Sequence, residues 1–334
     1  MVNTGTITKL FNTFPHFRIL VIGDVMIDSY MWGEVSRISP EAPIPILASS
    51  TRENRLGGAA NVALNIQALG GIPLLCSVIG EDDQGKLFMQ RMSYHHLEME
   101  GIMTDPSRIT TRKTRIISRN QHLLRVDEEN DAPLSSALEE RFIRQIEQII
   151  QKHRIDCIVF EDYDKGVCTP AVIANTIKLA HERDIPVCVD PKRRQFDAYR
   201  QVTLLKPNFK ELQEGLKTDL DKTDIPTLFD VCREYQKKAD IQFMLVSLSE
   251  QGVFISNGRE YKVIPAHVRD VADVSGAGDT LIATAALCYV SGMDVFELAA
   301  VANIAGGLVC GRVGVVTVNR EELAAECARL GEKS

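Results

Sequence analysis

The sequence predicts an α/β protein in which a mostly parallel sheet is covered by helices on both faces. Short apolar runs that suit strands buried on both faces recur along the chain, and helical patterns separate many of them. Two stretches, about residues 30–50 and 110–127, break this alternation and suit edge strands that stand off the main sheet as a lid. We therefore expect one domain over residues 1–334, with a small β lid.

The first expected strand is the run 17–23, which is apolar and ends at a glycine. Comparable runs predict strands at 74–79, 155–160, 185–189, 202–205 and 243–247. Helical patterns predict helices at 59–69, 135–153, 170–183 and 227–238. In a sheet of this kind, ligands bind where the carboxyl ends of strands meet the starts of helices.

The lid segments have their own signatures. Residues 36–46 contain three prolines, which exclude a helix and a central strand. We expect the stiff segment 36–45 to act as a rigid flap. Residues 112–127 mix β-branched side chains with cations, namely Lys113, Arg115, Arg119 and Arg125. Unpaired lid edges favour pairing with a second copy, so we expect a homodimer formed through the lid strands.

Composition and charge exclude several classes of function. The chain of 334 residues carries a net charge of −7, which argues against a nucleic-acid-binding surface. Its start lacks the features of a secretory signal, and its apolar runs are too short to span a bilayer. The eight cysteines form no C-x-x-C pair and several lie in apolar runs. We expect a cytoplasmic protein with buried free thiols and no membrane partner.

The most informative stretch is Asp273-Val-Ser-Gly-Ala-Gly-Asp279, which precedes an apolar, alanine-rich run suited to a buried helix. Gly276, Ala277 and Gly278 let backbone N–H groups approach a ligand, and a helix start has unpaired donors and a positive dipole end. Asp279 lies in the first turn of this helix, and we expect its side chain to face the ligand that these N–H groups approach. A capped helix explains the motif equally well on its own, but an anion pocket beside a general base suits phosphoryl transfer to a hydroxyl.

Other expected strand ends also carry polar or glycine residues. Gly57 and Gly58 open the first long helix, and Asn61 offers a donor and an acceptor to sugar hydroxyls. Asn208 and Glu211 could form only a capping box, or could lie on nucleotide phosphates and magnesium. Further strand ends carry Lys192, Ser247, Glu250 and Gly252. Because all should lie along one edge of one sheet, the joint pattern favours a ligand site.

With these motifs the sequence resembles the ribokinase-like (PfkB) carbohydrate kinases over essentially its whole length. The first family signature is present as Gly57-Gly-Ala-Ala-Asn61-Val-Ala63, and the second is the stretch from Asp273 to Asp279. The resemblance implies a three-layer α/β/α fold, with ATP and Mg²⁺ as cofactors and lid strands that often pair two subunits. It leaves open whether K⁺ activates the enzyme.

Within that family the sequence resembles the kinases of D-glycero-β-D-manno-heptose 7-phosphate in lipopolysaccharide-core precursor synthesis. Short runs carry this resemblance: 23–28, 36–43, 118–121, 162–166 and 190–192. It implies phosphorylation of the anomeric C1 hydroxyl to give heptose 1,7-bisphosphate. Many such kinases continue into an adenylyltransferase, for which 334 residues leave no room, so we expect a stand-alone kinase or one domain of a longer protein.

The resemblance assigns roles to residues at matching positions. Asp279 would be the general base, with the amides of residues 276–279 around the transferring group. The substrate would be held by Asp24, Asp28, Gly57, Gly58, Asn61, Lys113, Arg115, Arg119, Gln121, Asp162 and Lys165. The nucleotide would be held by Lys192, Asn208, Glu211, Ser247, Glu250, Gly252 and Asn303, with Asn208 and Glu211 also serving the metal.

Three other functions compete with this hypothesis. One is a kinase of the same family with another sugar or a nucleoside as acceptor, against which the runs 36–43 and 118–121 argue. Another is a non-catalytic sugar-phosphate sensor, which would have no need of Asp279. A dinucleotide-dependent dehydrogenase is a distant third, because no G-x-G-x-x-G follows the first strand.

Overall fold

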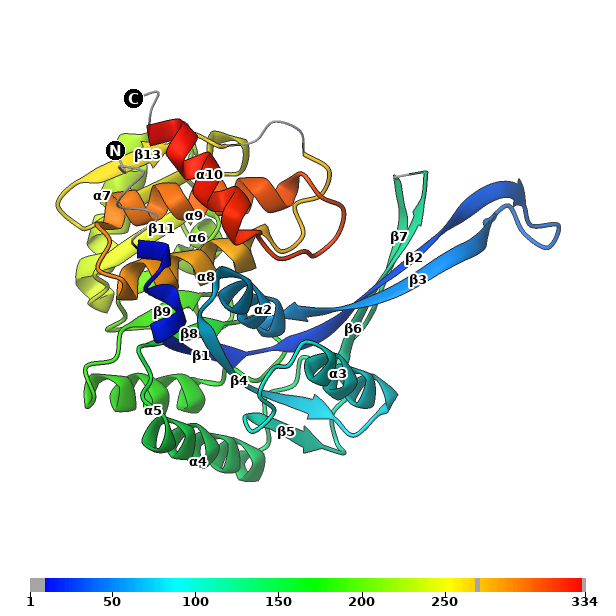
Figure 1. The fold of residues 1–334 in the computed structure, drawn as a ribbon, viewed down its shortest axis with the longest axis horizontal. Helices are drawn as coiled ribbons and strands as arrows, with labels where there is room; N and C mark the ends of the chain where they lie inside the picture. The colour runs from blue at the N-terminus through cyan, green and yellow to red at the C-terminus, as the bar shows by residue number, and fades with distance from the viewer. Residues whose placement is uncertain (1–9, 120, 268–270, 332–334) are drawn as a thin grey trace.

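The computed structural model describes residues 10–119, 121–267 and 271–331. These residues form a nine-stranded main sheet in the order β13-β12-β11-β10-β9-β8-β1-β4-β5 (Figure 1). All neighbours from β11 to β5 pair in parallel, while β12 and β13 are antiparallel. The strands are β1 (Arg18–Gly23), β4 (Ile72–Gly80), β5 (Ile102–Asp105), β8 (Cys157–Glu161), β9 (Val187–Asp190), β10 (Leu204–Leu205), β11 (Phe243–Ser247), β12 (Val253–Ser256) and β13 (Tyr261–Ile264).

Helices cover both faces of this sheet, as expected for three layers. One face packs against α2 (Ala59–Leu69), α3 (Asp83–Tyr94), α8 (Ala277–Val290), α9 (Val295–Cys310) and α10 (Arg320–Gly331). The other face packs against α4 (Ser136–Lys152), α5 (Pro170–His181), α6 (Phe209–Leu216) and α7 (Ile225–Ala239).

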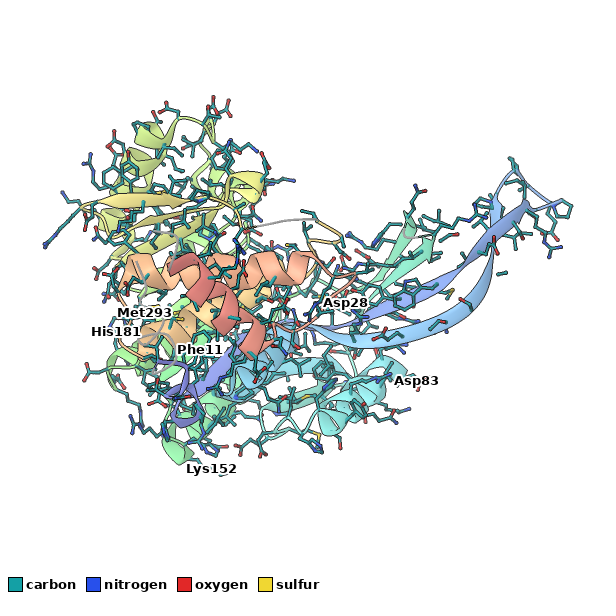
Figure 2. All side chains as sticks on the ribbon, turned by 45° about the horizontal axis from the view of Figure 1, so that its top comes forward. Phe11, Asp28, Asp83, Lys152, His181 and Met293 are labelled. Carbon is teal, nitrogen blue, oxygen red and sulfur yellow. The ribbon has the colours of Figure 1, made fainter. Side chains whose placement is uncertain are left out.

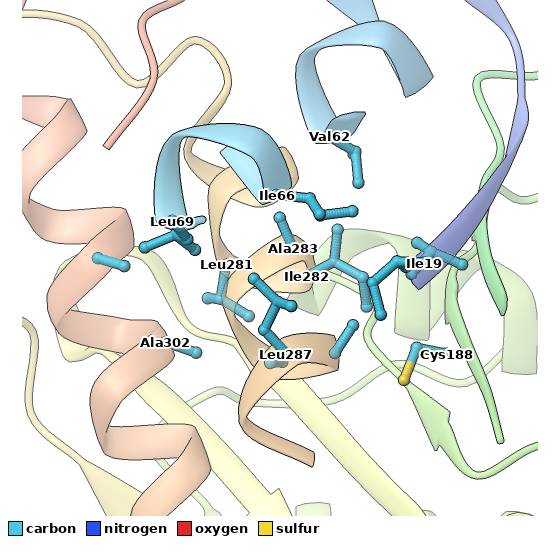
Figure 3. Packing of buried hydrophobic residues seen from close by; sticks show 14 of the residues in the cluster. Ile19, Val62, Ile66, Leu69, Cys188, Leu281, Ile282, Ala283, Leu287 and Ala302 are labelled. Atoms are coloured by element: carbon cyan, nitrogen blue, oxygen red, sulfur yellow. The ribbon is translucent and has the colours of Figure 1, made fainter. Parts of the chain in front are cut away.

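Strand β1 shows why its run is apolar throughout. Ile19 and Val21 enter the core between the sheet, α2 and α8, whereas Leu20 and Ile22 enter the core under α4 and α5. Figure 3 shows part of the first core, where side chains of α2 and α8 meet Ile19. A strand buried on both faces has no polar side to expose, so alternation disappears from its sequence.

The predicted elements are confirmed with shifts of a few residues at their ends. Helix α2 spans the predicted range, and its C-cap Gly70 is left-handed at φ 101°. The predicted strand at 185–189 begins later, at Val187, because Pro186 has no N–H for the ladder. The helix expected after Asn208 is α6, whereas the helices α3, α9 and α10 and the strands β5, β12 and β13 were not predicted.

The lid is a separate four-stranded sheet in the order β3-β2-β6-β7. Its strands are β2 (Val25–Ile38), β3 (Pro45–Gly58), β6 (Thr111–Ser118) and β7 (Gln121–Glu128). The lid is larger than the predicted segments, since β2 leaves the main sheet directly after β1 and β3 returns as far as α2 (Figure 1). Asn120, in the predicted run 118–121, lies outside the described residues.

The proline-rich run 36–43 does not form a flap over the main sheet. It lies at the far tip of the β2–β3 hairpin, where the chain reverses and Ser39 N–H donates to the Ile44 carbonyl at 2.9 Å (Figure 1). Prolines suit this tip because the strand pairing ends there and few backbone donors are needed.

All eight cysteines are buried free thiols, as predicted. Within the described part of the chain, none of the helices combines the length and the apolar character that a membrane crossing requires.

Candidate active site

The start of α8 has a left-handed glycine and unpaired backbone donors. Its N-cap Gly276 is left-handed at φ 79°, and a Cβ there would lie 2.8 Å from the Asn61 side-chain nitrogen. In the described residues the backbone N–H groups of Gly278 and Asp279 make no hydrogen bond, as expected for a first helical turn. Two unpaired donors and the positive end of the helix dipole have the chemistry that suits an anion.

Asp279 lies buried at this position and is held from two sides. Its Oδ2 accepts a hydrogen bond of 2.7 Å from Asn61 of α2, and its Oδ1 accepts one of 2.9 Å from the Tyr163 hydroxyl. Burial raises the pKa of Asp279 to about 6, although both hydrogen bonds counteract this by stabilising the charged form. A carboxylate with such a pKa is ionised near neutral pH and can still accept a proton.

A second group of charges is buried next to Gly278. Lys206, which follows β10, forms an ion pair of 2.7 Å with Asp190 at the end of β9, and both side chains are almost inaccessible. A Cβ on Gly278 would lie 3.4 Å from Lys206 Nζ and 3.5 Å from Asp190 Oδ2, so this pair faces the start of α8. The carboxylates raise the pKa of Lys206 although burial opposes this. A cation is thus fixed beside the two unpaired amides of α8.

Glu161 completes this group from the end of β8, in register with Asp190. Its side chain is fully buried, and neither carboxylate oxygen has a hydrogen-bond partner among the described residues. Burial raises the pKa of Glu161 well above its ordinary value, and Asp190 and Asp279 add to the effect. Burial and the two neighbouring carboxylates thus favour the protonated form of Glu161.

Lys192 and Glu211 form an ion pair at the same sheet edge. Asn208 caps α6, and its Oδ1 accepts from the Glu211 N–H at 2.8 Å while a Glu211 oxygen accepts from the Asn208 N–H at 2.8 Å. These two hydrogen bonds form a capping box, which confirms that Asn208 caps α6. Burial would lower the pKa of Lys192, but Asp190, Glu211 and Glu161 hold it above its ordinary value. Its Nζ also lies 5.1 Å from the centre of the Tyr163 ring.

Asp24 organises the loop that carries Tyr163. Its carboxylate accepts backbone hydrogen bonds from Tyr163 at 2.9 Å, Lys165 at 3.0 Å and Val167 at 3.0 Å. Burial raises the pKa of Asp24, and these N–H donors oppose the rise. Both oxygens are thus engaged with the protein, and Asp24 positions the loop.

Asp162 and Glu161 point to opposite sides of the sheet because successive side chains alternate. Asp162 accepts from the Tyr199 hydroxyl at 2.9 Å and from the Asp164 N–H at 2.8 Å. Tyr199 belongs to the core under α4 and α5, which is the face away from α8. Burial raises the pKa of Asp162 to about 7, and Asp24 contributes. The structure therefore brings Glu161, and not Asp162, toward Asp279.

The lid contributes Asp28, which is buried where the lid leaves the main sheet (Figure 2). Arg115 of β6 donates to its Oδ1. A Cβ on Gly57 would lie 2.1 Å from Asp28 Oδ2, so only glycine leaves room for this carboxylate. Gly58 is left-handed at φ 61°, and a Cβ there would lie 2.4 Å from the Asp24 carbonyl oxygen. The two glycines thus allow α2 and the lid to meet at Asp28 and Asp24.

Cations gather on the lid face that bears Asp28. Arg55, Lys113, Arg115 and Arg125 share this face, because β3, β2, β6 and β7 place them in adjacent registers. Lys113 Nζ donates to Glu129 at 3.0 Å and to Asp127 at 3.2 Å, and Lys165 Nζ donates to Glu129 at 2.7 Å. The cations of this face are thus held in ion pairs with neighbouring carboxylates.

Two predicted substrate residues lie at the distal end of β6–β7. Arg119 is 77% exposed and pairs with Glu34 at 2.8 Å, and Gln121 pairs with Ser118 at the hairpin. Within the chain, the structure does not bring these two residues to Asp279.

The remaining residues predicted to bind the nucleotide follow α6 in the chain. Ser247 ends β11 beside Asn208, and Gly252 begins the next hairpin at φ 94°. Glu250 is largely exposed and pairs with Lys222. Asn303 is buried in α9 and donates to the Pro265 carbonyl at 2.8 Å.

Sequence reasoning missed several residues of this site. Glu161 and Tyr163 each lie next to the predicted Asp162 in the chain, and a strict count of strand alternation could have selected Glu161 over Asp162. Lys206 precedes the predicted Asn208 by two residues, and this proximity was the one feature of the sequence that indicated it. Nothing local indicated Glu129, because its partners come from distant segments.

Comparison with known proteins defines the class of this protein, which is a sugar kinase. Residues 17–322 match the pfkB family carbohydrate kinases, and the chain belongs to this family. It is 38% identical to the bifunctional protein HldE of Geobacter metallireducens over 95% of this chain and 64% of that protein. HldE of Wolinella succinogenes is 39% identical over 92% of this chain and 64% of that protein. The chain therefore spans less than two thirds of the length of these relatives.

Solved structures share the fold at low sequence identity. Phosphofructokinase-2 from Escherichia coli in complex with potassium superposes with a TM-score of 0.78 and 18% identity, covering 94% of this chain and 99% of that chain. Ribokinase of Arabidopsis thaliana, complexed with ribose and ATP, gives a TM-score of 0.68 and 17% identity, covering 94% of this chain and 98% of that chain.

Proposed function

We propose that the protein transfers the γ-phosphoryl group of ATP to the C1 hydroxyl of D-glycero-β-D-manno-heptose 7-phosphate. The product would be heptose 1,7-bisphosphate, a precursor of the lipopolysaccharide core. The observation that carries the proposal is the buried Asp279 carboxylate beside the unpaired amides that start α8. Family membership and the likeness to HldE proteins support the class of reaction, and the heptose-kinase runs support the acceptor.

In this mechanism Asp279 takes the proton of the C1 hydroxyl as its oxygen attacks the γ-phosphorus. The amides of Gly278 and Asp279 stabilise negative charge on the transferring group, and Lys206 adds a fixed cation nearby. Asn61 and Tyr163 hold the base in place, so little reorganisation is needed when the substrate arrives.

Magnesium would be held at the edge that carries Asn208 and Glu211. Within the described ranges, no cluster of three or more His, Cys, Asp or Glu side chains is arranged to hold a metal ion. This donor set fits Mg²⁺, which commonly takes one or two protein oxygens and completes its shell with water and phosphates. Asp190 Oδ1, buried and without a partner among the described residues, lies at the neighbouring strand end and fits the same use. When bound, the ion neutralises charge on the β- and γ-phosphates.

The outer face of the lid supports a proposed homodimer. On the side opposite Asp28, the adjacent registers carry Met31, Ile116 and Leu124, and Leu124 is 57% exposed. A contiguous apolar surface of this kind favours contact with a second copy. Sedimentation at micromolar concentration should give a dimer, and a Leu124→Glu variant should shift it toward monomer. A wild-type monomer contradicts this part of the proposal.

The reaction is tested with an ATP-coupled assay across hexose and heptose phosphates, nucleosides and free sugars, in potassium and in sodium buffers. Heptose 7-phosphate should be the preferred acceptor, and ³¹P NMR should show a new phosphate on C1. Asp279→Asn should fold and lose turnover on the order of 10²–10⁴-fold. Preference for another acceptor, or near-normal turnover of a folded Asp279→Asn, rejects the proposal.

A further inference from the structure

Arg108 is a buried cation that joins two segments distant in the chain. It lies between β5 and β6, and only 9% of the residue is exposed. Its Nη1 donates to the Ala132 carbonyl at 2.9 Å, and its Nη2 donates to the Lys165 carbonyl at 2.5 Å. Only a planar fork of donors can bind two carbonyls in this way.

The Lys165 carbonyl belongs to the loop that contacts Asp279. On the other side of this loop, Asp24 accepts from the N–H groups of Tyr163 at 2.9 Å and Lys165 at 3.0 Å. The Tyr163 hydroxyl in turn donates to Asp279 at 2.9 Å. A carboxylate and the guanidinium of Arg108 therefore hold Lys165 from its N–H and from its carbonyl, two residues away from the tyrosine.

The backbone of this loop needs such support. Asp164 has a left-handed φ of 55°, which is unfavourable for a residue with a side chain. Gly166 is left-handed at φ 90°, and a Cβ there would lie 2.0 Å from the Ala132 carbonyl oxygen. Arg108 binds this same oxygen, so it fixes the spacing of the two segments where Gly166 packs against Ala132.

The backbone that carries Arg108 is itself fixed at the end of β4. The Gly80 N–H donates to the Thr110 hydroxyl at 2.9 Å, and the Thr110 N–H donates to Asp82 at 2.7 Å. A Cβ on Gly80 would lie 2.5 Å from the Arg108 carbonyl oxygen, so the two segments are in close contact. The guanidinium therefore reaches the loop from a fixed position.

The charge of Arg108 also supports Asp24. Burial raises the pKa of Asp24, whereas its N–H donors and Arg108 oppose the rise. Burial lowers the pKa of Arg108, and Asp24 opposes this in turn. An ionised carboxylate accepts stronger hydrogen bonds than a neutral one, so the two buried charges reinforce each other on the same loop.

We propose that Arg108 is a positioning residue for the phosphoryl transfer. Its guanidinium holds the Lys165 and Ala132 carbonyls, and the loop is thereby fixed so that Tyr163 keeps its hydrogen bond to Asp279. The inference rests on the proposed function for the role of Asp279 as the base, and on hydrogen bonds within the protein for the positioning.

Arg108→Lys tests the proposal, because it keeps the charge and loses the planar fork. In ¹³C-tyrosine NMR without ligand, the Tyr163 signal, assigned with Tyr163→Phe, should titrate with Asp279 at about pH 6 in wild type. In Arg108→Lys the midpoint should rise by about 0.5–1 pH unit, and kcat/KM at pH 5 should fall by about 3–10-fold relative to its plateau.

Arg194→Lys is the matched control. Arg194 donates to the Asp131 carbonyl at 2.9 Å and to the Asp131 carboxylate at 2.6 Å, directly beside Ala132 in the chain. Among the described residues it makes no hydrogen bond to the loop 163–167. This variant should leave the titration and the pH profile in place.

The double variant of Arg108→Lys and Tyr163→Phe shows whether Arg108 acts through the tyrosine. Its acid limb should coincide with that of Tyr163→Phe alone, because the hydrogen bond to Asp279 is already removed. A further shift in the double variant would reveal another route and overturn the inference. The other charged groups that face Asp279 stay unchanged in every variant, namely Asp190, Glu161 and Lys206.

The outcomes separate positioning from a purely structural role. If Arg108→Lys lowers Tm and leaves the titration and the acid limb unchanged, Arg108 only stabilises the fold and the inference is wrong. Arg108→Gln, which keeps a donor without a charge, replaces Arg108→Lys if that variant does not fold, and loss of the fold in both also overturns the inference. If wild type prefers another acceptor, the proposed acceptor fails, whereas the ligand-free titration still decides the role of Arg108.

Discussion

The hydroxyl of Tyr163 donates a hydrogen bond of 2.9 Å to Oδ1 of Asp279. The same residue is tied through its backbone N–H to Asp24, so β1, the loop after β8 and the start of α8 meet in one chain of hydrogen bonds. Burial raises the pKa of Tyr163 well above its ordinary value, with Asp279 adding to the effect, so the hydroxyl stays protonated and remains a donor. The loop thus supplies a permanent hydrogen bond to the ionised form of the base.

Tyr163→Phe should shift the acid limb of the pH–rate profile to higher pH. In wild type, kcat/KM should fall about tenfold per pH unit below about 6, because burial raises the pKa of Asp279 to about 6 and a protonated base cannot accept a proton. Removing the Tyr163 hydrogen bond leaves the charged form less stabilised and raises that pKa further. Profiles from pH 5 to 9 measure the shift.

Tyr199→Phe is the control for this experiment. Its hydroxyl bonds Asp162 on the opposite face of the sheet, so the variant should leave the acid limb in place. If the Tyr163→Phe profile coincides with that of wild type, Tyr163 does not tune the base.

Glu161→Gln should stabilise the protein more at pH 8 than at pH 5. Burial raises the folded-state pKa of Glu161 above its unfolded value, so the folded protein binds the extra proton and wild-type stability falls as pH rises between these two values. Glutamine does not titrate and removes that loss. Urea unfolding at both pH values measures the difference, and an equal effect at the two pH values contradicts a raised pKa of Glu161.

Lys206→Met should lower the free energy of unfolding by about 3–5 kcal/mol, because Asp190 is left buried without its partner. The double variant with Asp190→Asn should recover part of this loss, since no unpaired charge remains. Chemical denaturation of both single variants and the double variant gives the coupling energy. Additive losses would show that the pair does not act as a unit.

Gly57→Ala should weaken sugar binding by displacing Asp28, whose Oδ2 would lie 2.1 Å from the new methyl group. The carboxylate must turn and lose the Arg115 contact, so we expect a higher KM for the sugar and a lower Tm. Gly306→Ala is the matched control in α9, where the nearest atom lies at 3.5 Å and the helix favours alanine. Unchanged kinetics in Gly57→Ala would argue against a fitted Asp28 pocket.

Much of the fold could be predicted because its signals are local. The apolar runs of β1, β8 and β11 predicted strands buried on both faces, and the structure confirms them. Short elements were missed, such as the four-residue strands β12, which is buried throughout, and β13, which is largely exposed at the sheet edge. The tip position of residues 36–43 could not be predicted, since prolines exclude structures but do not say how far a hairpin extends.

The sequence by itself determined the layered fold, the helix that starts at Gly276-Ala-Gly-Asp279, and the gathering of polar strand ends at one edge. These follow from periodicity, turn chemistry and the direction of parallel strands, which residues close in the chain specify. Only the tertiary structure decided that Glu161 faces Asp279 while Asp162 faces Tyr199, that Lys206 pairs with Asp190, and that Lys113 and Lys165 share Glu129. Such contacts depend on strand register and on which distant segments meet, and a shift of one residue would send each side chain to the other face.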